Sequence, residues 1–198
     1  MLAMLDGRFE DARRQLQEAR AASDELGQRF DSLAMLVEFA EIEAMADNLE
    51  EAESLLSGVP ERLEQIQSFL ALPAAAALSR CRTLRGDPAA GFALLPPEPA
   101  GDDDIFSRTT WYRAAALAHL GLGRLDEAER FARTAIDALE STDLITHRAD
   151  AFQILGEIAA ARGHLDAARD HLGTAVRLYE AKQAAAPLAV ARRRLEAL

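Results

Sequence analysis

Four histidines are the side chains of this sequence best suited to metal or acid–base chemistry: His119, His147, His164 and His171. None has the two-histidine-plus-glutamate spacing that binds zinc on one helix. His164 and His171 could share a helix face, but about 10 Å of helix rise separates them. One metal ion cannot bridge that distance without a third ligand between them. We therefore expect no metal site.

Other motifs for catalysis are also missing. The pair of glycines at Gly121 and Gly123 lacks the lysine and downstream glycine of a phosphate-binding loop. Cys81 is the single cysteine, which excludes an internal disulfide, and its apolar surroundings favour a packed thiol over a reactive one. Trp111 and Tyr112 are expected to pack between helices rather than to stack on a ligand. We expect no catalytic residues and no cofactor, and so no enzyme.

The composition indicates helices and an uneven charge. Alanine accounts for 42 of 198 residues, and the net charge is −11. Residues 1 to 66 hold 16 acids and 6 arginines, a balance of −10, and the nine acids from Asp31 to Glu61 are interrupted by no base. Such a surface repels nucleic acid. Two interpretations of the acidic stretch remain open: a solvated outer face, or a docking patch for a basic partner.

A six-residue phrase that recurs five times indicates how helices are arranged around these residues. Each copy pairs a turn residue with acids or proline at a helix start and ends on a small residue. The copies are Gly7 to Ala12, Asp47 to Ala52, Gly86 to Gly91, Gly123 to Ala128 and Gly163 to Ala168, so the small residue recurs after 40, 39, 37 and 40 residues. The spacing predicts an array of helix pairs, in which the phrase opens the second helix of each unit.

The expected helices cover almost the whole chain. They span about 8 to 26, 29 to 46, 49 to 57, 61 to 85 with a break near Pro73, 88 to 95, 104 to 121, 125 to 140, 145 to 162, 165 to 182 and 187 to 197. The apolar periodicity of three and four residues supports them. No window alternates as a strand.

One segment interrupts the array. Three prolines and a glycine between Pro96 and Gly101 cannot continue a helix, so the second helix of the third unit should be short. Asp102 to Asp104 then precede Ile105, where a helix N-cap belongs. We therefore divide a single array, 1–198, into N-terminal repeats (1–95), a Pro/Asp-rich loop (96–104), regular repeats (105–182) and a capping helix (183–198).

The two ends of the chain differ. Met1 to Leu5 reads as the last turn of a first helix, so the chain begins within a unit, either as a fragment of a longer array or as an unusual natural start. This N-terminal segment is also too short for a signal peptide, and an acidic residue follows too early in it. No apolar run approaches the roughly 18 residues of a membrane span. We expect a cytoplasmic protein with no membrane contact.

The phrase and the small residues seven positions later resemble the tetratricopeptide repeat (TPR). The likeness is best at 109–140, where Tyr112, Ala116, Leu120, Gly121, Gly123, Leu125, Ala128, Phe131 and Ala135 follow the family pattern in order. It is good at 148–180 and poor in the third unit, where Gly91 replaces the alanine. Units longer than the usual TPR of about 34 residues resemble the C-terminal arrays of bacterial signalling ATPases, transcriptional activators and multidomain nucleotide cyclases. The resemblance implies a right-handed α-solenoid of antiparallel helix pairs, about five repeats long.

The resemblance also implies a binding surface, because TPR proteins bind partners in a concave groove lined by first helices. Aligning the units places eight residues there: Val37, Glu41, Ala76, Arg80, Arg113, Leu117, Gln153 and Glu157. Family members that grip a peptide carboxylate use Lys, Arg and Asn. Only Arg80 and Arg113 match in charge, and Glu41 and Glu157 would repel a carboxylate. Binding of a peptide's C-terminal carboxylate is therefore not expected.

Two functions remain open. The first is a scaffold for protein–protein or interdomain contacts, acting as a regulatory segment of a larger bacterial signalling or transcriptional regulator, with a protein, a peptide or another domain of the same chain as its partner. The alternative is a sensor that binds a signal peptide or small ligand in the groove and shifts a regulatory equilibrium.

Overall fold

All regular structure is helical in the computed structural model, which describes residues 2–100 and 104–198. This confirms the all-α prediction for those residues. The helices are α1 (Leu2–Leu5), α2 (Phe9–Glu25), α3 (Arg29–Met45), α4 (Leu49–Leu56), α5 (Val59–Gln65), α6 (Ala71–Leu84), α7 (Pro88–Ala93), α8 (Ile105–Gly121), α9 (Leu125–Leu139), α10 (Ile145–Ala161), α11 (Leu165–Ala181) and α12 (Ala185–Glu196). None of them is both long and apolar enough to cross a membrane.

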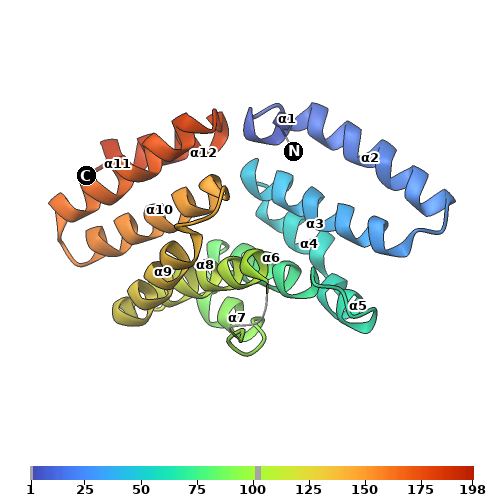
Figure 1. The fold of residues 1–198 in the computed structure, drawn as a ribbon, viewed down its shortest axis with the longest axis horizontal. Helices are drawn as coiled ribbons and strands as arrows, with labels where there is room; N and C mark the ends of the chain where they lie inside the picture. The colour runs from blue at the N-terminus through green and yellow to red at the C-terminus, as the bar shows by residue number, and fades with distance from the viewer. Residues whose placement is uncertain (1, 101–103) are drawn as a thin grey trace.

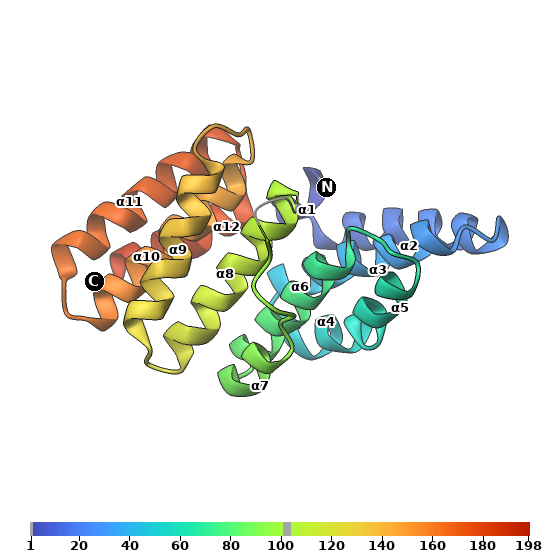
Figure 2. The same ribbon diagram turned by 60° about the horizontal axis from the view of Figure 1, so that its bottom comes forward.

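The helices pack in neighbouring pairs along the chain. Helix α2 packs on α3, α8 on α9 and α10 on α11, and first helices of successive units also meet, α6 with α8 and α8 with α10. Figure 1 shows the resulting arc, whose two ends approach each other at the top, and Figure 2 shows α8 to α11 lying side by side. Helix α1 contacts α12, and Leu5 packs on the cluster formed by α10, α11 and α12.

The recurring phrase has one backbone conformation in all five copies. Its first residue lies in the left-handed region each time: φ is 77° at Gly7, 65° at Asp47, 94° at Gly86, 71° at Gly123 and 78° at Gly163. This conformation turns the chain sharply after one helix and is least costly for glycine. The last residue of the phrase is buried in all five copies: Ala12, Ala52, Gly91, Ala128 and Ala168. Small buried residues there let the paired helices approach closely, as the sequence predicts.

The expected helix from 61 to 85 is wrong. Two helices, α5 and α6, occupy this segment, and the break falls at residues 66–70 rather than at Pro73. The amide of Ser68 bonds back to the carbonyl of Leu63 at 2.9 Å, and Gln67 has a φ of 53°, so the helix ends in a left-handed turn. Pro73 lies in the first turn of α6, where its missing N–H has no intrahelical partner to lose.

The proline loop ends one helix and supports another. Helix α7 stops at Ala93, which confirms the short second helix of the third unit. Asp104 accepts a hydrogen bond from the Ser107 amide at 2.9 Å and so caps α8, as expected. Asp102 and Asp103 lie outside the described residues. The Trp111 indole donates to the Pro96 carbonyl at 3.0 Å, which ties the loop to the core of α8, α9 and α10.

Candidate functional site

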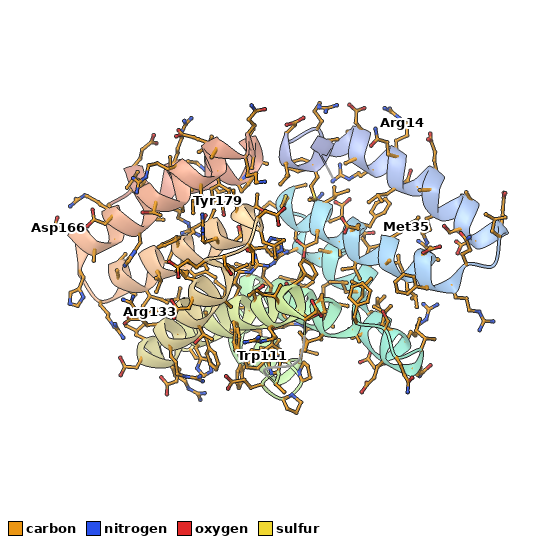
Figure 3. The ribbon with its side chains drawn as sticks, viewed as in Figure 1. Arg14, Met35, Trp111, Arg133, Asp166 and Tyr179 are labelled. Atoms are coloured by element: carbon orange, nitrogen blue, oxygen red, sulfur yellow. The ribbon has the colours of Figure 1, made fainter. Side chains whose placement is uncertain are left out.

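Five polar side chains from successive units form what we call the inter-unit row: Glu41, Arg80, Arg113, Asp150 and Tyr179. They come from α3, α6, α8, α10 and α11. Arg80 pairs with Glu41, and Arg113 pairs with Asp150, so each ion pair joins the first helices of two neighbouring units. In Figure 3, Tyr179 lies towards the middle of the arc, whereas Arg14 and Asp166 project from its outer edge.

Arg113 is the most enclosed charge of the row. Its side chain is 10 % exposed, and it bonds to the Thr109 carbonyl, the Thr110 hydroxyl and the Asp150 carboxylate. Burial lowers the pKa of this guanidinium, and the charge of Asp150 opposes that effect. The second oxygen of Asp150 accepts from the Tyr179 hydroxyl at 2.5 Å. Burial and the same carboxylate raise the pKa of Tyr179, which therefore stays a hydrogen-bond donor.

The pair of Glu41 and Arg80 is more open than the pair at Asp150. The two side chains are 25 % and 30 % exposed. The charge of Glu41 raises the pKa of Arg80, so the guanidinium stays ionised. Glu38, one turn earlier on α3, is exposed, yet the surrounding protein and the charge of Glu41 raise its pKa.

His147 is the titratable side chain most strongly shifted beside this row. Burial, together with the positive charges of Arg113 and Arg80, lowers its pKa to about 2. Its ring lies 5.3 Å from that of Phe106, centroid to centroid. The imidazole is therefore neutral at physiological pH, and it leaves the two arginines as the cations of this region.

The eight predicted groove residues do not share one environment. Glu41, Arg80 and Arg113 belong to the inter-unit row, and Gln153 donates to Glu157 at 3.2 Å on α10. Glu157 also pairs with Arg194 of α12 at 3.5 Å. Val37 and Leu117 are half-buried, and Ala76 is 1 % exposed, so Ala76 offers almost no surface to a partner.

The sequence does not predict Asp150 or Tyr179 as site residues, and it singles out His147 only as a candidate for metal or acid–base chemistry. Asp150 lies one turn before Gln153 on α10, so extending the alignment of units by one more turn would have reached it. Tyr179 belongs to a second helix, and no pattern within first helices points to it. Burial is the main reason for the low pKa of His147, with smaller contributions from Arg113 and Arg80, and the residues next to it in the sequence indicate neither effect.

The negative charge of the N-terminal third is partly neutralised by arginines of the same chain. Glu43 is 6 % exposed and accepts from Arg13 at 2.6 and 2.7 Å and from Asn48 at 2.8 Å. Glu53 pairs with Arg82 of α6 and with Arg85, which follows the last residue of that helix. These carboxylates therefore join helices and do not form part of a uniformly solvated face.

Two surface hollows lie away from the predicted groove residues. One, of about 520 Å³, is bounded by the proline loop, Trp111, His119 and Phe131. The other, of about 330 Å³, lies among α2, α3 and α4 near Arg20 and Phe39. Neither is lined by any of the eight residues expected in the groove.

Histidine, cysteine and acidic side chains are the residues that could bind a metal ion or act as a nucleophile. Within residues 2–100 and 104–198, no cluster of three histidine, cysteine or acidic side chains could hold a metal ion. Cys81 is buried, as expected, and desolvation raises the pKa of its thiol to about 11. In comparisons with known proteins, no protein-family model matches the chain, and no curated protein matches it.

Proposed function

We propose that this chain is a non-catalytic interaction scaffold, built as a right-handed TPR-like α-solenoid with a C-terminal capping helix. Its partner would be a protein, a peptide or another domain of a larger bacterial signalling or transcriptional regulator. The observation that carries this proposal is the inter-unit row, in which first helices of consecutive units meet through partly exposed charges.

The row suits a polypeptide partner for electrostatic reasons. Glu41 and Arg80 pair with each other when no partner is bound, so neither of these two charges is uncompensated in the free protein. Each is still about a quarter to a third exposed and can exchange part of that contact for a charged or amide group of a partner. Because the inter-unit row carries charges of both signs, it would fix the position at which a partner chain binds more than it would raise the affinity.

Site-specific photo-crosslinking in the native host tests the proposal. A photoreactive amino acid replaces Glu38, which is exposed on α3 beside Glu41. The matched control places it at Arg133, which is 57 % exposed on α9. We expect one discrete protein adduct from position 38, lost when Arg80→Glu is added. Equal adducts from both positions would contradict the proposal.

The sensor alternative is distinguished by thermal unfolding with low-molecular-mass extracts and peptide pools. A rise in melting temperature that Arg80→Glu abolishes, without a crosslinked protein, would favour a small-ligand sensor over a scaffold. Arg113→Glu is less suitable for this test, because Arg113 is buried and the loss of its pair with Asp150 should itself destabilise the fold.

A further inference from the structure

Four large apolar side chains are exposed at two turns, one from α2 to α3 and the other from α5 to α6, and we call them the turn patch. Leu26 is 72 % exposed, Phe30 40 %, Ile66 47 % and Phe69 62 %. The rings of Phe30 and Phe69 approach to 6.4 Å between centroids, so the turn from α2 to α3 adjoins the turn from α5 to α6. Figures 1 and 2 show α2, α3 and α5 on the right-hand side of the molecule.

The geometry of these turns does not require apolar residues. Leu26 and Ile66 each follow a helix and precede a residue in the left-handed region, Gly27 or Gln67. The turn from α11 to α12 has the same form: Lys182 precedes Gln183, whose φ is 55°, and Ala184 bonds back to the Tyr179 carbonyl as Ser68 does to Leu63. The equivalent of Leu26 and Ile66 is therefore a lysine in the last unit.

The two segments that carry the turn patch are acidic on balance. Residues 24–31 carry three acids and one arginine, and residues 61–69 carry two acids and one arginine, a sum of −3. Glu25, Glu61 and Glu64 are exposed. Two copies of this chain placed patch to patch would bring these like charges together, which costs free energy. A second copy is therefore a poor occupant of the patch.

We propose that the turn patch docks a basic amphipathic helix of another protein, whose apolar stripe covers Leu26, Phe30, Ile66 and Phe69 and whose lysines or arginines meet Glu25, Glu61 and Glu64. Large exposed apolar side chains accompanied by exposed charges are the composition of a contact site. This surface is formed by turns between units and is separate from the inter-unit row, so it does not depend on the function proposed above.

The probe is an amphipathic peptide of leucine and lysine, capped at both ends and labelled with fluorescein, and its binding to the full chain is read by anisotropy. A peptide of leucine and glutamate with the same apolar stripe is the charge control. The variant Leu26→Gln/Phe69→Gln removes apolar surface without changing charge. Leu165→Gln is its matched control, because Leu165 is 43 % exposed far from the turn patch.

We expect the leucine–lysine peptide to bind, the double variant to weaken it about tenfold or more, and Leu165→Gln to leave it unchanged. Glu61→Gln/Glu64→Gln should also weaken binding, more at low salt than at high salt. Binding that the double variant does not change, or equal binding of the glutamate peptide, overturns the proposal. So does concentration-dependent dimerisation that Phe69→Gln abolishes, because it assigns the patch to a second copy. Circular dichroism verifies that each variant is folded.

Discussion

Tyr179 donates its hydroxyl hydrogen to Oδ1 of Asp150 at 2.5 Å, while Arg113 occupies Oδ2 of the same carboxylate. One side chain of α10 thus joins α8 to α11, across the boundary between the fourth and fifth units. Tyr179 is 2 % exposed and Asp150 is 37 % exposed, so the carboxylate connects a buried hydrogen-bond donor to a partly solvent-exposed ion pair.

Removing this carboxylate should cost more than removing one of its donors. Asp150→Ala leaves the buried Arg113 guanidinium and the Tyr179 hydroxyl without their acceptor, and we expect a loss of about 2 to 3 kcal/mol in the free energy of unfolding. Tyr179→Phe removes one hydrogen bond and should cost about 1 kcal/mol. Urea unfolding followed by circular dichroism measures both. Equal losses in the two variants would show that Arg113 does not depend on Asp150.

Gly91 allows α7 to lie against α6. A Cβ at this position would collide with the Thr83 hydroxyl oxygen and would stand 2.8 Å from the Ser79 carbonyl oxygen. Gly91→Ala should therefore push α7 away and destabilise the fold by about 1 to 3 kcal/mol. The matched control is Gly173→Ala in α11, where the new Cβ meets only the Arg177 side chain at 3.6 Å. That change should be neutral or stabilising by up to about 1 kcal/mol through helix propensity.

Gly91 also illustrates what the sequence could predict. The repeated phrase located the turns and the buried small residue of each unit, because those depend on a few adjacent residues. The reason for glycine in the third unit was not visible, since it depends on Thr83 and Ser79 of the preceding helix. The break between α5 and α6 was misplaced at Pro73, because a left-handed Gln67 carries no compositional signal.

The candidate site was less predictable than the fold for the same reason. Alignment of units located Glu41, Arg80 and Arg113, which do meet carboxylates or guanidinium groups of neighbouring units. It could not find Asp150 as the partner of Arg113, because pairing depends on how far one helix is rotated against the next. A shift of one helical turn along α10 changes which of its side chains can reach Arg113.

His147 should make the fold less stable in mild acid. Its pKa is lowered to about 2 in the folded state from an ordinary 6.5, so the unfolded chain binds a proton below about pH 6.5 and the folded chain does not. The free energy of unfolding is therefore highest above pH 6.5, and it decreases as the pH falls, by at most about 1.4 kcal/mol per pH unit. His147→Gln should flatten the dependence of the urea midpoint between about pH 7 and 5. His164→Gln, at an exposed position, should keep the wild-type slope.

Cys81 should be inert towards alkylation in the folded protein. Its side chain is 1 % exposed, so a reagent can hardly reach it. Burial also raises the pKa of the thiol to about 11, so only a small fraction of it is ionised to the reactive thiolate. Iodoacetamide at mildly alkaline pH should label it slowly in buffer and rapidly in guanidinium chloride, as read by intact mass. Fast labelling in buffer would mean that α6 opens on the timescale of the reaction.

The contact between the two chain ends should hold α12 in place. Leu5 packs on the cluster that includes Ala149, Tyr179 and Ala191, and a Cβ at Gly7 would lie 3.9 Å from that of Ala186. Leu5→Ser removes apolar surface from one side of this cluster, while α12 keeps its packing on α11. Hydrogen exchange followed by mass spectrometry should therefore show faster exchange in α12 and unchanged exchange in α6. If α12 exchanges at the wild-type rate, the ends touch without stabilising each other, and α11 alone determines the order of the last helix.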